Sequence, residues 1–67
     1  MQTILGSNGQ IGYELANELY QNYTKELRLV GRHPQKIHDT DQVVVADLTD
    51  ADQAFQAIQG SDVVYFS

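Results

Sequence analysis

The sequence predicts an α/β fold in which short strands form a parallel sheet. Apolar segments of strand length alternate along the chain with segments of helical periodicity, and this alternation is typical of sheets built by strand–helix–strand crossovers. The apolar segments are also uninterrupted, as in the run "VVVA", which favours parallel strands covered on both faces. The expected order of elements is therefore β-α-β-loop-β-α-β.

Each element is placed by its own residue pattern. Gly6 directly follows the first apolar segment, and Pro34, the only proline, lies in a long polar stretch. We expect strands at residues 3–5, 26–30, 43–47 and 62–66, helices at residues 10–22 and 50–59, and a loop with at most one helical turn at residues 32–42.

Apolar stripes predict the two helices. In the first helix, Ile11, Leu15 and Leu19 recur every four residues, which places them on one helix face. The stripe of the second helix comprises Ala51, Ala54, Phe55 and Ile58.

The ends of the second helix carry their own signals. Thr49, with Asp52 three residues later, is a variant of the capping box that starts many helices. Gly60 stands where a left-handed helix end favours a residue without Cβ.

Charge and composition argue against several classes of partner. The 67 residues carry a net charge of −5, which is the wrong sign for binding a nucleic-acid backbone. The apolar runs are much shorter than the ~20 residues that span a membrane, and the N-terminus has no signal-like segment. The chain has no cysteine, which suits a reducing compartment. We therefore expect a cytoplasmic protein that binds neither nucleic acid nor membranes.

The predicted topology leaves the sheet incomplete. In the usual doubly wound strand order, 3-2-1-4, crossovers run in opposite directions and place their helices on opposite faces. Each face would then carry one helix, although parallel sheets are normally covered on both sides. We expect residues 1–67 to be the N-terminal part of one larger domain, whose free sheet surfaces associate with the rest of that chain or with a second copy.

Three of the five glycines, Gly6, Gly9 and Gly12, lie where the first strand turns into the start of the first helix. A strand that turns directly into a helix presents free backbone N–H groups and the positive end of the helix dipole, and both favour a pyrophosphate. Gly6 would permit the tight turn, Gly9 would let the backbone approach the phosphates, and Gly12 would let the helix pack close to the strand. The motif has one more residue between its first two glycines than G-x-G-x-x-G.

The segments "ILGSNGQIG", "LVGR", "VVVADLTD" and "GSDVVYFS" together resemble the opening of the extended and atypical short-chain dehydrogenase/reductases. These families include sugar-nucleotide epimerases and dehydratases and the reductases similar to isoflavone reductase. The resemblance covers essentially the whole chain. It implies a Rossmann-type doubly wound parallel sheet, an NAD(P) cofactor and an oxidoreductase, epimerase or dehydratase as the complete protein.

The resemblance also implies roles for individual positions. The implied phosphate loop comprises Gly6, Ser7, Asn8, Gly9, Gln10, Ile11 and Gly12. Asp47 and Leu48 match residues that flank the adenine, and Phe66 and Ser67 match residues that line the cofactor. From the residues alone, the glycines could instead serve only turns and packing, and Asp47 could simply precede a helix cap.

The choice between NADP and NAD depends on the end of the second strand. A site for NAD usually has a carboxylate there, which accepts hydrogen bonds from the ribose hydroxyls and repels a 2′-phosphate. This chain has Val30 and Gly31 instead, followed by Arg32 and then Lys36. Because a guanidinium can stack on adenine and bind phosphate through two hydrogen bonds, NADP is favoured. The alternative is that Arg32 and Lys36 are solvated loop charges.

Catalysis is not expected from these residues themselves. The resembled enzymes use a Tyr-x-x-x-Lys pair for proton transfer, and no tyrosine of this chain has a lysine four residues later. We expect the catalytic residues and the small-molecule substrate site to lie in further parts of the protein.

Two alternative functions stay open. One is an NmrA-like regulator that binds the dinucleotide without turning it over, and the other is an interaction module that pairs through its sheet edge.

We predict structural roles, and no catalytic or metal-binding roles, for the histidines and for the tyrosines of the first helix. His33 and His38 lie five residues apart in a polar loop without a third ligand, so we expect surface histidines and no metal site. Tyr13, Tyr20 and Tyr23 stand at helical spacing and are expected to be half buried against the core.

Overall fold

The computed structural model describes residues 1–6 and 9–67, and it contains every predicted element with shifts of one or two residues at the ends. The elements are β1 (Gln2–Leu5), α1 (Gln10–Asn22), β2 (Leu27–Gly31), β3 (Gln42–Val45), α2 (Ala51–Ala57) and β4 (Val63–Phe66). None of the helices in these described ranges is long and apolar enough to cross a membrane.

The four strands form one sheet in the order β3-β2-β1-β4, and every neighbouring pair is parallel. This confirms the predicted doubly wound topology. In the register of the sheet, Leu5 of β1 lies beside Val30 of β2 and Phe66 of β4. Because all strands run the same way, their carboxyl ends meet at one edge of the sheet, where α/β proteins bind ligands.

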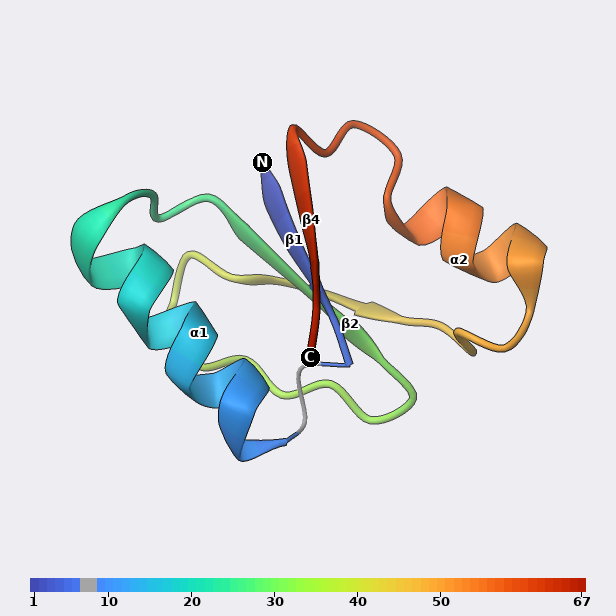
Figure 1. The fold of residues 1–67 in the computed structure, drawn as a ribbon, viewed down its shortest axis with the longest axis horizontal. Coiled ribbons are helices and arrows are strands. Elements are labelled where there is room, and N and C mark those ends of the chain that lie inside the picture. Colours follow the sequence, from blue (N-terminus) through green and yellow to red (C-terminus); the bar gives the residue numbers. More distant parts are fainter. Residues whose placement is uncertain (7–8) are drawn as a thin grey trace.

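The two helices lie on opposite faces of the sheet, with α1 on one side and α2 on the other (Figure 1). Alternate residues along each strand supply the two cores. The core beneath α1 comprises Ile4, Ala16, Leu19, Leu27 and Leu29, with Leu15, Tyr20, Ile37 and Tyr65 packed against it. The core beneath α2 comprises Leu5, Val30, Ala46 and Ala57, with Val44, Leu48, Ile58 and Val64 packed against it.

Three of the predicted helical stripe positions, Ile11, Ala51 and Phe55, are wrong because these side chains are exposed. Ile11 is 73% exposed and Phe55 is 64% exposed. In α1 the line that faces the sheet runs through Gly12, Ala16 and Leu19, and Ile11 is rotated from it by about 100° around the helix. In α2 the covered side chains include Ala57 and Ile58, so Phe55 points outward. Small residues thus occupy buried positions of both helices, whereas Ile11 and Phe55 remain in solvent.

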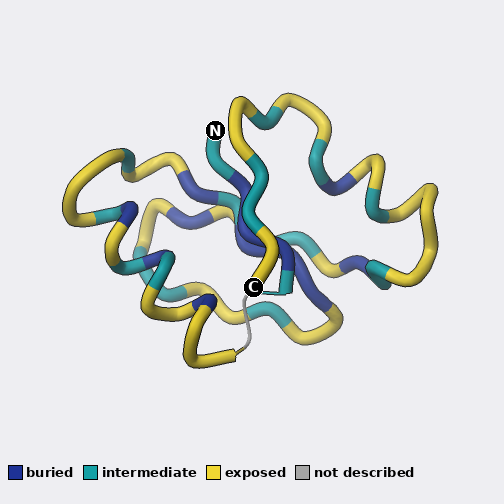
Figure 2. Tube along the Cα trace, in the orientation of Figure 1, coloured by how far each residue is buried: buried dark blue, intermediate teal, exposed yellow. Residues whose placement is uncertain are grey.

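The edge strands β3 and β4 are more exposed to solvent than their uninterrupted apolar runs predict. Val45 of β3 is 74% exposed and Phe66 of β4 is 84% exposed, and in Figure 2 the C-terminal end of the chain trace is yellow. The expectation that residues 43–47 form a strand buried on both faces is therefore wrong. β3 is an edge strand, and α1 packs on Ile4, Leu27 and Leu29 of the central strands.

The start of α2 differs in detail from the predicted capping box. The N-cap is Asp50, not Thr49, and the Asp50 side chain accepts hydrogen bonds from the backbone N–H groups of Asp52 and Gln53. Thr49 instead donates to Asp47. At the other end, Gly60 has the expected left-handed conformation, with φ +78°.

The aromatic side chains of α1 divide into two groups. Tyr20 is half buried as expected, whereas Tyr13 and Tyr23 are 45% and 73% exposed. His38 is not a surface histidine, because its ring stacks on Tyr20 with the centroids 3.8 Å apart. The neighbouring carboxylate of Asp41 is fully buried and accepts hydrogen bonds from the backbone N–H groups of Ile37 and His38. The β2–β3 loop is thus fastened to α1.

Candidate functional site

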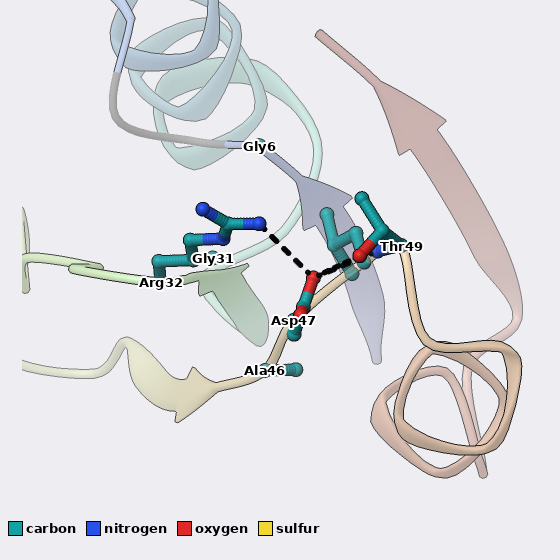
Figure 3. Close-up of a pocket in the computed structure, with 7 residues that line it drawn as sticks. Gly6, Gly31, Arg32, Ala46, Asp47 and Thr49 are labelled. Atoms are coloured by element: carbon teal, nitrogen blue, oxygen red, sulfur yellow. Dashed lines mark hydrogen bonds and ion pairs between the residues drawn. The ribbon is translucent and has the colours of Figure 1, made fainter.

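An open pocket of about 230 Å³ lies at the carboxyl ends of β1, β2 and β3 (Figure 3). Its lining residues are Gly6, Gly31, Arg32, Ala46, Asp47, Leu48 and Thr49. They come from three chain segments, each of which directly follows or ends a strand of the parallel sheet. The strand order therefore brings together residues that are far apart in the sequence.

The turn after β1 requires glycine at position 6. Gly6 has φ +77°, and its N–H donates to the carbonyl oxygen of Val30 at 2.8 Å. A Cβ at this position would lie 3.1 Å from the backbone oxygen of Ser67. Both the left-handed backbone and this close approach disfavour larger residues. The next two residues of the predicted phosphate loop, Ser7 and Asn8, lie outside the described residues.

The N-terminus of α1 follows this turn. Gly9 is the N-cap in an extended conformation, and its carbonyl oxygen accepts the first helical hydrogen bond, from Tyr13, at 3.0 Å. The N–H groups of residues 10–12 have no acceptor within the helix, as in every first helical turn. No described atom beyond its chain neighbours lies within 4 Å of a Cβ built on Gly9. Gly12 is buried, as its predicted packing role requires.

Asp47 links the other two sides of the pocket. Its Oδ1 accepts hydrogen bonds from the Thr49 hydroxyl at 2.6 Å and from the Thr49 N–H at 3.0 Å, and it lies 3.4 Å from Nη2 of Arg32. These Thr49 hydrogen bonds, with a smaller contribution from Arg32, hold the pKa of Asp47 below its usual range. The N–H of Asp47 donates to Gln53 Oε1 of α2 at 2.8 Å. The carboxylate is thereby fixed toward the pocket and toward Arg32 (Figure 3).

The remaining predicted residues lie around the pocket or away from it. Ser67 does not line it, but its hydroxyl donates to the carbonyl oxygen of Gly6 at 2.6 Å and so supports the turn. Phe66 precedes it at the same edge of the sheet. Lys36 lies outside the pocket, and its ammonium group donates to the carbonyl oxygen of Asp39 at 3.4 Å.

Sequence reasoning missed Thr49 as a residue of this site. Its spacing could have revealed it, because a threonine two residues after an aspartate commonly donates to the aspartate side chain. Ala46 was also missed. It is buried beneath α2 and lines the pocket, and its type carries no signal beyond a place at the end of a strand.

The groups at this edge suit a ligand with two separated anionic parts. The backbone N–H groups at the start of α1 and the positive end of its dipole favour one anion. The guanidinium of Arg32, 67% exposed, favours a second. Apolar Leu48 and the carboxylate of Asp47 complete the wall of the pocket. A doubly wound parallel sheet with such a strand–turn–helix at its first crossover defines a Rossmann-type dinucleotide-binding domain.

Comparison with known families agrees with this class. Residues 6–67 match the family model described as NAD(P)H-binding, so the chain belongs to the NAD(P)H-binding family and its cofactor is NAD(P). A search of the curated proteins found no match.

Solved structures share the fold over almost the whole chain. A Rossmann-fold NAD(P)-binding family protein from Shigella flexneri has a TM-score of 0.80 and 34% identity, over 98% of this chain and 36% of its own. A short-chain dehydrogenase/reductase from Veillonella parvula has a TM-score of 0.80 and 26% identity, over 97% of this chain and 33% of its own.

A third structure, a mutated uronate dehydrogenase, has a TM-score of 0.81 and 20% identity over 97% of this chain and 24% of its own. At that identity the likeness concerns the fold alone. The chain spans at most 36% of the length of these three proteins.

Proposed function

We propose that these residues are the N-terminal, cofactor-binding part of an NADP-preferring oxidoreductase, epimerase or dehydratase. Backbone N–H groups of residues 9–12 bind the pyrophosphate, Arg32 binds the 2′-phosphate, and Asp47 with Leu48 flanks the adenine. The bound cofactor supplies hydride transfer at its nicotinamide. The residues of this chain bind and orient it.

The preference for NADP rests on the charge at the end of β2. The strand ends at Gly31, which has no side chain, and the next residue is Arg32. A carboxylate at this place would accept hydrogen bonds from the ribose hydroxyls and repel a 2′-phosphate. Arg32 instead offers a planar set of donors and a positive charge, which match a phosphate. The exposed guanidinium at the pocket is the single observation that carries this proposal.

The proton-transfer groups belong to the rest of the protein. No tyrosine in the sequence has a lysine four residues later. Phe66 and Val63 leave apolar surface of β4 in solvent, and a further part of the same chain would cover this surface and carry the small-molecule substrate site. A cytoplasmic location accords with the absence of cysteine.

Titration of the protein in its natural length with NADPH and with NADH tests the proposal. We expect tighter binding of NADPH, by about tenfold or more, because one charge-assisted bidentate contact is available only to the 2′-phosphate. Arg32→Asp should abolish or reverse this difference, because the new carboxylate repels the 2′-phosphate and can accept hydrogen bonds from the ribose hydroxyls of NADH.

Lys25→Asp is the matched control. It makes the same change in net charge next to the start of β2, at the opposite end of the sheet from the pocket. The preference for NADPH should survive in this variant. Equal affinity for both cofactors in the unsubstituted protein, unaltered by Arg32→Asp, would remove Arg32 from the site.

A further inference from the structure

We propose that Asp47 competes with the 2′-phosphate of NADP for the guanidinium of Arg32, and that it thereby limits how strongly the protein prefers NADPH over NADH. This inference rests on the proposed function, because it assigns Arg32 to the 2′-phosphate. It makes Asp47 a specificity-determining residue, in addition to any contact with the adenine.

The geometry at Asp47 Oδ1 carries the first step. One oxygen accepts two short hydrogen bonds from Thr49, at 2.6 and 3.0 Å, and a much longer contact from Arg32, at 3.4 Å. Charge-assisted N–H···O bonds are usually about 2.7–2.9 Å long. Thr49 therefore takes up most of the acceptor capacity of this oxygen, and Arg32 is held weakly enough to exchange partners.

The second step concerns the charges at the pocket. Among the described residues that line it, Arg32 is the one cation and Asp47 the one anion. Lys36 lies outside the pocket. A phosphate that approaches Arg32 must therefore displace or share the Asp47 contact. NADH lacks the 2′-phosphate and leaves the Arg32–Asp47 pair intact.

The competition predicts opposite effects for two substitutions. Asp47→Asn keeps an oxygen acceptor for Thr49 but removes the charge, so Arg32 is released and the ratio of the NADH to the NADPH dissociation constant should rise about two- to fivefold, the range expected for one exposed ion pair. Thr49→Val removes the hydroxyl donor. The carboxylate then attracts Arg32 more strongly, and the same ratio should fall.

The ratio isolates this effect from other roles of Asp47. The adenine is common to both cofactors, so any contact that Asp47 makes with it cancels. A double-mutant cycle then identifies the partner. In an Arg32→Ala background, Asp47→Asn should leave the ratio unchanged, because no guanidinium remains to compete for. Thermal unfolding followed by circular dichroism establishes that each variant is folded.

The readout is isothermal titration of the protein in its natural length with NADPH and with NADH. An unchanged ratio in Asp47→Asn, with NADPH still bound, would overturn this inference and leave the proposed function standing. A rise of the ratio that persists in the Arg32→Ala background would also overturn it, since Asp47 would then act on the phosphate directly. Failure of the unsubstituted protein to bind either cofactor would overturn the proposed function itself.

Discussion

Arg28 donates a hydrogen bond from Nη1 to the carbonyl oxygen of Ala57 at 2.9 Å and thereby joins β2 to the C-terminal end of α2. The same nitrogen donates to the carbonyl oxygen of Gln59 at 2.7 Å, and Nε donates to Gln42 Oε1 at 2.6 Å. Carbonyl groups at a helix end lack partners within the helix, and a cation there also interacts favourably with the helix dipole. Arg28 therefore fixes the helix whose first turn contacts Asp47 through Gln53.

Replacement of Arg28 should destabilise the protein. Arg28→Met keeps much of the apolar side-chain stem and removes every donor, so the free energy of unfolding should fall by about 1–3 kcal/mol. Arg28→Lys should lose less, since an ammonium group can still reach one carbonyl oxygen. Urea unfolding measures both variants. Equal stability of Arg28→Met and the unsubstituted protein would show that these hydrogen bonds do not hold α2.

Substitution by alanine should lower the free energy of unfolding by different amounts at Gly6 and Gly60, the two glycines with a left-handed backbone. No described atom lies within 4 Å of a Cβ built at Gly60. Gly60→Ala should therefore lower the free energy of unfolding only through its unfavourable backbone conformation, by about 1–2 kcal/mol. Gly6→Ala has the same unfavourable φ and also places Cβ 3.1 Å from the Ser67 oxygen. The loss of unfolding free energy should therefore be larger at Gly6. A smaller loss at Gly6 than at Gly60 would contradict the close packing of the turn against the end of β4.

Gly9 separates stability from cofactor binding. Its φ of −82° and ψ of 169° are open to any residue, and serine is a better N-cap than glycine by a few tenths of a kcal/mol. Gly9→Ser should therefore leave the melting temperature unchanged or slightly raised. If the phosphates approach this backbone, the new side chain should weaken NADPH binding by about tenfold or more. Calorimetric titration of the folded variant with NADPH measures this effect. An undiminished affinity for NADPH would show that the phosphates bind elsewhere.

Asp47 should contribute to stability in a pH-dependent way. Hydrogen bonds from Thr49, with help from Arg32, lower the pKa of Asp47 from its ordinary value of 3.8. A depressed pKa in the folded state stabilises the protein above the unfolded pKa, and this stabilisation disappears as the pH falls through the folded pKa. The stability difference between the protein and Asp47→Asn should thus be constant above about pH 5 and shrink below about pH 4. Urea midpoints across this range measure it, and a difference independent of pH would argue against the Thr49 hydrogen bonds.

Local patterns were enough to predict the topology and much of the pocket. The bounds of α1, the left-handed Gly60 and the turn at Gly6 each depend on residues close in the sequence. The strand order follows from the alternation of elements, and the order in turn places Arg32 near Asp47. The pattern of the sequence is therefore sufficient to place the pocket residues Gly6, Arg32 and Asp47 at this edge of the sheet.

Contacts between distant segments could not be predicted in this way. The exposure of Phe55 depends on which face of α2 meets the sheet, and Ala57 rather than a larger residue forms that contact. From the sequence, Arg28 is only a polar residue within a strand. The placement of α2 shows which carbonyl groups it binds. The burial of Asp41 likewise depends on the packing of its loop near α1.

The most direct test of the dinucleotide site follows the backbone amide signals of ¹⁵N-labelled protein during addition of NADPH. We predict that the largest shifts occur at residues 9–12, which we propose bind the pyrophosphate, and at Arg32 and Asp47, which we propose contact the adenosine part. Shifts confined to other regions, with these amides unchanged, would contradict the assignment of this edge of the sheet as the cofactor site.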